Sequence, residues 1–228
     1  MNYVNHIENN RNYILKYLEY ISYILLGHVV LSTLKFRNQN TKYYLMHFFA
    51  NMHIVSLTFP YVVETMIDPV KFINTDIFPS VTTVIFHTYH VLFYNNISID
   101  EKIHHLINVY GTLPLLWYNY NYMCNFALFF LMGLPGGITY ILLFLKDIGI
   151  VSSLTEKRIS KHLNLWIRCP GSIVSITLIY VQMIYNPNKY DNYSRMIGWL
   201  SIVGTYWNGI YFTKSITESH IRKLYQNK

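Results

Sequence analysis

Two adjacent histidines, His104 and His105, begin an apolar run directly after three charged residues in the segment DEKIHHLINVYG (residues 100–111). A neutral imidazole can act as a general base near neutral pH, so both are candidate catalytic residues. Neighbouring residues of a helix point about 100° apart. We therefore expect one histidine to face a site and the other a neighbouring helix. The four-residue spacing to Asn108 favours His104 as the inward one.

Other polar side chains within apolar segments are candidates for substrate binding. His87 and His90 are three residues apart and share a helix face. A single histidine in a membrane helix also serves as a hydrogen-bond partner for a neighbouring helix, which is the favoured interpretation of His28, His47 and His53 taken singly. Arg168 either reaches the membrane surface or holds a phosphate or carboxylate inside the protein. The candidate substrate-binding residues are His53, His87, His90, Asn108 and Arg168.

The histidine spacing differs from that of membrane di-iron oxygenases. Those enzymes need several histidine boxes of the HxxxH and HxxHH kinds, whereas residues 87–90 read HTYH and Glu101 stands three residues before His104. We therefore predict no metal site and no bound cofactor. A retinal protein would need a lysine in the middle of its last span, and Lys214 lies at the end of that segment.

The composition indicates a membrane protein. Of the 228 residues, 52% are hydrophobic and only 13% are charged, against about 25% charged residues in soluble domains. Apolar stretches of the about 20 residues that cross a bilayer recur along the chain. The expected fold class is all-α, a polytopic bundle of seven membrane spans, at residues 13–34, 43–63, 77–96, 103–119, 123–145, 164–186 and 195–213.

The predicted spans form one membrane domain at residues 13–213, with short tails at 1–12 and 214–228. Cytoplasmic loops carry an excess of Lys and Arg, so the N-terminus is predicted to be lumenal or extracellular and the basic C-terminal tail cytosolic. No basic soluble face with stacking aromatics is visible, so no nucleic-acid partner is predicted. Five basic residues fall on the predicted lumenal side, and twelve fall on the cytosolic side: Lys35, Arg37, Lys42, Lys102, Lys146, Lys157, Arg158, Lys161, Lys214, Arg222, Lys223 and Lys228.

The polar residues within the spans gather at one depth. At the rise of about 1.5 Å per helical residue, most of the histidines, together with Arg168, fall in the cytosolic halves of the spans. The outer halves, such as residues 113–116 and 173–180, hold little that ionises. Ionisable groups inside a membrane are costly and mark functional sites. This pattern predicts a polar cavity that is open to the cytosol and closed toward the lumen.

Residues 40–215 resemble the TLC domain family. The resemblance rests on the histidine-bearing segment NMHIVS (51–56), on DEKIHHL (100–106) after a short loop, and on GLPGG (133–137) within a later span. A polar link with Glu156 and Lys157 and then the segment NLWIR (164–168) follow. The GLPGG segment itself allows either close helix packing or contact with a lipid tail.

The resemblance implies a lipid-handling seven-helix bundle, often in the endoplasmic reticulum. In the ceramide synthase branch, paired histidines, here His104 and His105, are implicated in transferring an acyl chain from acyl-CoA to a sphingoid amine. Those synthases also carry an HDxxD element downstream of the pair, whereas this chain has no Asp or Glu between Glu101 and Asp147.

Two functions are therefore expected. The first is an integral membrane protein that binds or modifies a membrane lipid in a cytosol-facing cavity, by acyl transfer with acyl-CoA as co-substrate and His104 or His105 as the base. The second is a non-catalytic regulator or sensor of membrane lipid composition. Both make membrane lipids the expected partners.

Overall fold

The computed structural model describes residues 3–36, 38, 40–71, 76–94, 99–106 and 122–226. Helices make up these ranges and no strand occurs in them, which confirms the all-α prediction. Two π-helical turns, η3 (Phe129–Gly133) and η4 (Asn164–Arg168), and a 3-10 turn, η5 (Pro187–Lys189), lie between helices. The helices are α1 (Tyr3–Thr33), α2 (Asn40–Ile67), α3 (Phe78–Phe93), α4 (Ile99–His104), α6 (Tyr122–Leu128), α7 (Leu134–Asp147), α8 (Ser153–Leu163), α9 (Cys169–Tyr185) and α10 (Asn192–Gln226).

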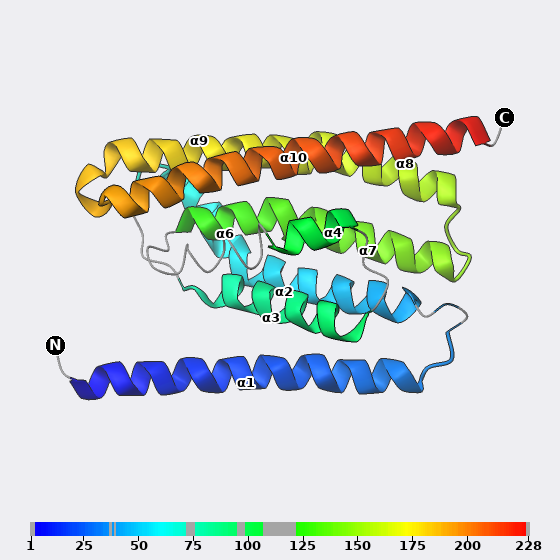
Figure 1. Ribbon diagram of the computed structural model, residues 1–228, viewed down its shortest axis with the longest axis horizontal. Coiled ribbons are helices and arrows are strands. Elements are labelled where there is room, and N and C mark those ends of the chain that lie inside the picture. The colour runs from blue at the N-terminus through cyan, green and yellow to red at the C-terminus, as the bar shows by residue number, and fades with distance from the viewer. Residues whose placement is uncertain are drawn as a thin grey trace.

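The long helices lie side by side and alternate in direction (Figure 1). α1 lies along one edge of the bundle, and α9 and α10 lie along the opposite edge, with α2, α3, α6 and α7 between them. One end of the bundle gathers the end of α1, the start of α2, the α7–α8 connection and the C-terminus of α10. The predicted cytosolic set of basic residues comes largely from these segments. The charge asymmetry of the sequence is therefore a difference between the two ends of the bundle. We call the end with the start of α2, the α7–α8 connection and the C-terminus of α10 the basic end.

Three helical stretches are long and apolar enough to cross a membrane: Ile14–Thr33, Cys124–Asp147 and Ser153–Tyr185. They coincide with the first, fifth and sixth predicted spans and are compatible with an integral membrane protein. The predicted count of seven needs correction, because the described ranges hold six long helical segments. Three of these, α2, α3 and α10, lack the length or the mean hydropathy of a membrane span. α3, for example, has 16 residues, about 24 Å of helix against a hydrocarbon core of about 30 Å. Most of the fourth predicted span, residues 107–119, lies outside the described residues.

Several helix boundaries differ from the predicted ones. α1 already begins at Tyr3 and α10 continues to Gln226, so both predicted tails are largely helical. The sixth span was predicted to begin at residue 164, but α8 runs through η4 into α9 without a break in the helix. The polar segment with Glu156 and Lys157 is therefore a helical extension of that span rather than a loop.

A proline follows each π-helical turn. Pro135 is the second residue after the end of η3, and Pro170 is the second residue after the end of η4. A proline within a helix lacks the N–H for the usual hydrogen bond, and its ring clashes with the carbonyl four residues earlier. The wider π turn accommodates this clash without ending the helix, as insertions of this kind do elsewhere.

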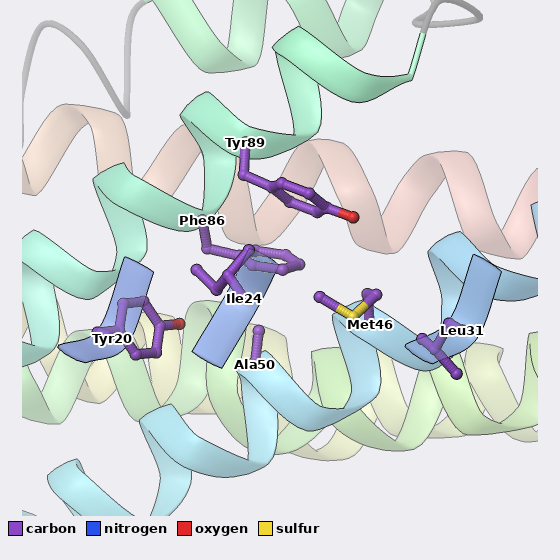
Figure 2. Close-up of a cluster of buried hydrophobic side chains, with 7 residues drawn as sticks. All are labelled: Tyr20, Ile24, Leu31, Met46, Ala50, Phe86 and Tyr89. Atoms are coloured by element: carbon purple, nitrogen blue, oxygen red, sulfur yellow. The ribbon is translucent and has the colours of Figure 1, made fainter. Parts of the chain in front are cut away.

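A hydrophobic cluster joins the first three helices (Figure 2). Tyr20, Ile24 and Leu31 of α1 pack on Met46 and Ala50 of α2 and on Phe86 and Tyr89 of α3. The close packing of these side chains stabilises the contact among the three helices through van der Waals attraction. The ring of Phe86 also lies edge-on to His47, 4.6 Å between centroids, so this cluster supports the polar site described below.

The GLPGG segment packs directly on α2. A Cβ atom added to Gly136 would lie 2.8 Å from Nδ2 of Asn51, and one added to Gly133 would lie 3.1 Å from a methyl group of Val55. Glycine is therefore required for α7 to approach α2 this closely. The geometry supports the close-packing interpretation of GLPGG, although Gly136 also lines the cavity.

Candidate functional site

A cavity of about 1080 Å³ lies inside the bundle. Its lining comes from α1, α2, α3, α6, α7, α9 and α10, together with η3, η4 and His105 directly after α4. Sites for small molecules usually measure about 300–1,000 Å³, so the space suffices for a ligand as large as a lipid chain and its headgroup.

Four histidines meet at one wall of this cavity. His47 comes from α2, His87 and His90 come from α3, and His105 follows α4. Ring centroids lie 5.1 Å apart in each of the pairs His47–His90, His90–His105 and His87–His105. All four side chains are buried and line the cavity. We call these four residues the histidine cluster.

The hydrogen bond of His87 fixes its tautomer. Its Nδ1 lies 2.7 Å from the backbone carbonyl oxygen of Thr83. A carbonyl oxygen only accepts, so Nδ1 carries the proton and donates it, which leaves the lone pair of the neutral ring on Nε2. The turn of α3 that ends at His87 thus presents a basic nitrogen of known identity.

Within the histidine cluster, Nε2 of His47 and Nδ1 of His90 are buried without a hydrogen-bond partner in the described part of the chain. Leaving a buried polar atom without a partner costs about 1–3 kcal/mol. Both rings line the cavity, so a ligand that offers hydrogen bonds there would recover this free energy.

Two tyrosines complete the wall around His47. The ring of Tyr140 stacks on His47, with centroids 4.2 Å apart and planes 22° apart. The ring centroid of Tyr43 lies 4.1 Å from that of His47 and 4.7 Å from that of His90. The hydroxyl oxygens of Tyr43 and Tyr140 lie 3.4 Å apart, within hydrogen-bonding distance. The cluster therefore has phenolic hydroxyls beside its imidazoles and can both donate and accept protons.

The structure brings together three of the predicted histidines and Arg168. His87, His90 and His105 belong to the histidine cluster, and Arg168 lines the same cavity. His105, the second member of the adjacent pair, lines the cavity. The side chain of His104 and all of Asn108 lie outside the described residues, so the inward orientation of His104 stays a prediction.

His53 does not belong to the cavity lining. Its ring stacks on Tyr20, with centroids 5.2 Å apart, and lies edge-on to Phe78 at 6.3 Å. His53 comes six positions after His47, which corresponds to a rotation of about 240° around the helix axis. The two histidines of α2 therefore face different neighbours, and His53 holds α2 against α1 and α3.

Tyr43, His47 and Asn51 are cavity residues that the sequence analysis did not select. They are spaced four residues apart on α2, so they form one stripe along the helix. That spacing was the signal that could have identified them. The carboxamide oxygen of Asn51 is buried without a partner in the described ranges, like the imidazole nitrogens nearby.

The cavity lining is cationic at one side and apolar at another. Lys42 and Arg168 line it, and none of the described residues that line it is Asp or Glu. Leu131, Ile179 and Met183 line the part formed by η3 and α9. Such a site suits a molecule with a polar or anionic group at one end and an apolar chain at the other. No family model, curated protein or solved structure matches this chain.

Proposed function

We propose that this protein is an integral membrane protein that binds a membrane lipid in the cavity and places the lipid's polar group beside the histidine cluster. The observation that carries the proposal is the continuity of a cavity of about 1080 Å³, which joins four buried histidines to an apolar wall inside a bundle of apolar helices. A lipid is the ligand class that needs both surfaces at once.

Acyl transfer is the reaction that the histidines would support. A neutral imidazole of the cluster, with His105 as the first candidate, would take a proton from an attacking amine as the new C–N bond forms. The C–S bond of an acyl-CoA thioester would break in the same reaction, and the imidazolium would return the proton to the departing thiolate. The resemblance of residues 40–215 to the TLC domain family supports this choice.

A non-catalytic lipid sensor is the second candidate, and one observation favours it. Histidine bases are often oriented by a carboxylate, and no carboxylate lines the described part of the cavity. Lipid binding without turnover would then change the packing of the helices that surround the cavity.

The basic end of the bundle would face the cytosol under the positive-inside rule, and the cavity residue Lys42, at the start of α2, lies near that end. The N-terminus would then be lumenal or extracellular and the C-terminus cytosolic, and the resemblance to the TLC domain family implies the membrane of the endoplasmic reticulum.

Purified protein in nanodiscs, supplied with a long-chain acyl-CoA and a sphingoid amine, tests the reaction by the amide that forms. We expect His105→Ala to abolish amide formation and His162→Ala to retain it, because His162 is an exposed histidine on α8 outside the cavity. Melting temperatures of both variants show whether either substitution unfolds the protein.

Native mass spectrometry of the same samples separates the two candidates. Bound lipid without turnover in the wild-type protein would support the sensor and exclude the enzyme. A wild-type protein that retains no lipid would overturn both.

A further inference from the structure

We propose that Arg168 binds the phosphate of an anionic lipid, and that the lipid's acyl chain lies along α10 toward Met183. This inference rests on the proposed lipid-binding function and adds the charge of the ligand and its direction in the cavity. Its first support is the state of the guanidinium group itself.

Arg168 is held over an aromatic ring without a counter-ion. Its Cζ lies 5.3 Å from the ring centroid of Phe212 on α10, and both residues line the cavity. Its Nε atom is buried without a hydrogen-bond partner, and none of the described carboxylates pairs with the group. An unpaired cation inside a helix bundle is costly. Arg is also the side chain best suited to phosphate, because its planar group offers two parallel N–H donors.

The surroundings add positive potential. Lys42 also lines the cavity, is half-buried, and forms no ion pair with a described carboxylate. By contrast, Lys146 pairs with Asp147 at 3.6 Å outside this lining. Neither cation of the cavity has an acidic partner among the described residues, which favours an anion over a zwitterion or a cation.

The anion site lies next to the histidine cluster. Arg168, Tyr140 and His47 line the same cavity, and the ring of Tyr140 stacks on His47. η4, which ends at Arg168, packs against α7, the helix that carries Tyr140. A phosphate on Arg168 would hold the adjoining part of the lipid within reach of the imidazoles.

The path along α10 from Arg168 toward Met183 is long enough for an acyl chain. Arg168 lies beside Phe212 of α10. Met183 lies beside Gly198 of the same helix, since a Cβ atom added to Gly198 would be 2.5 Å from its Sδ atom. The 14 residues from Gly198 to Phe212 correspond to about 21 Å of helix. One leaflet contributes about 15 Å to the hydrocarbon core, half of its about 30 Å. The described cavity residues of α10 along this path carry no charge: Gly198, Ser201, Gly204, Thr205 and Asn208.

A matched pair of lipids tests the proposal. The probes are 1-oleoyl-glycerol-3-phosphate and 1-oleoylglycerol, which differ only in the phosphate, bound to purified full-length protein in neutral nanodiscs. We expect the wild-type protein to bind the phosphate lipid at least about tenfold more tightly, the effect of one charge-assisted bidentate contact. Arg168→Gln should remove most of that preference and leave the affinity for 1-oleoylglycerol within about twofold.

Arg158→Gln is the control, because it makes the same substitution at an exposed arginine of α8 outside the cavity. It should keep the preference of the wild-type protein. An equal loss with Arg158→Gln would mean general surface attraction and would overturn the proposal. If Arg168→Gln does not fold, Lys42→Gln must lower the preference in the same assay for the proposal to stand.

Different outcomes would overturn the anion site and the lipid-binding function. Equal affinity of the wild-type protein for both lipids would overturn the anion site and leave the lipid-binding function intact. Binding of neither lipid would overturn the lipid-binding function as well.

Discussion

Within the histidine cluster, the imidazole nitrogens differ in what each can do. Nδ1 of His87 is committed as a donor to the carbonyl of Thr83. Nε2 of His47 and Nδ1 of His90 have no hydrogen-bond partner in the described ranges. A ligand hydroxyl or amine placed between the latter two nitrogens could be bound by either, as donor or acceptor, since a neutral imidazole has one nitrogen of each kind.

The residue at the start of α10 gives the protein a local dependence on pH. Ser194 donates hydrogen bonds to the carboxylate of Asp191 from its hydroxyl and from its backbone N–H, and these lower the pKa of Asp191. A carboxyl with a lower pKa in the folded state stabilises it fully above the unfolded pKa of about 3.9. That stabilisation is lost as the pH falls through the lower folded value.

We therefore expect Asp191→Asn to flatten the fall in melting temperature below about pH 4, where the wild-type carboxylate becomes protonated. Thermal unfolding in detergent between about pH 6 and pH 3 measures the effect. Ser194→Ala should flatten the curve too, because it removes the larger cause of the pKa shift. Parallel curves for wild type and Asp191→Asn would contradict the assignment.

The candidate site was predictable where helix geometry could be read locally. The spacing of His87 and His90 predicted a shared face, and both lie in the cavity. Depth, which depends only on the rise per residue, placed both histidines of α2 in the same half of the span and did not separate His47 from His53. The direction in which a side chain points depends on the rotation of about 100° per residue. The four-residue spacing of Tyr43, His47 and Asn51 indicates that these side chains share one face of α2. The contact of His47 with Tyr140, 93 residues later in the chain, needed the tertiary structure.

At the scale of elements, the two π-helical turns determine which residues reach the cavity. Leu131 and Met132 lie in η3, and Arg168 ends η4. The prolines that follow both turns are visible in the sequence, and a proline inside a helix is expected to kink or end it. Sequence alone did not predict that the helix would widen and continue, because that outcome depends on α2 and α10 packing against these turns.

The packing of η3 against α9 makes a second prediction. A Cβ atom added to Gly171 would lie 2.3 Å from Cγ of Phe130 and 2.6 Å from its Cβ, so the whole aromatic side chain would have to move. A Cβ added to Gly198 would meet Sδ of Met183 at 2.5 Å, but this atom lies near the end of a flexible side chain.

We therefore expect Gly171→Ala to lower the free energy of unfolding by about 1–3 kcal/mol, as overpacking does, and Gly198→Ala to lower it by less. Denaturant titration of both variants in mixed micelles measures the difference. In a Phe130→Ala background, Gly171→Ala should cost much less than in the wild-type protein. An equal cost in both backgrounds would show that Phe130 is not the obstacle.

At the scale of the whole molecule, the two ends of the bundle differ in charge and in their relation to the cavity. Lys42 lines the cavity near the basic end, whereas Lys71 and Lys189 lie at the other end, where Lys71 pairs with Glu64 at 3.5 Å. Helix composition alone identifies α1, α6–α7 and α8–α9 as candidate spans. The polar stripe of α2 lowers its mean hydropathy, yet that stripe faces the cavity rather than lipid. A helix with its polar face inside a bundle can cross a membrane without being uniformly apolar.

The arrangement of the ends therefore predicts that α2 crosses the membrane together with the apolar helices. In a protein whose Cys124 and Cys169 are replaced by Ala, single cysteines at Lys35 and Ile150 should react with a membrane-impermeant maleimide from one side of oriented vesicles. Single cysteines at Lys71 and Lys189 should react from the other side, because these positions lie at the opposite end of the bundle. Labelling after permeabilisation controls for buried positions. If the cysteines at Lys35 and Lys71 react from the same side, α2 does not cross, and the cavity would then lie beside the membrane rather than within it.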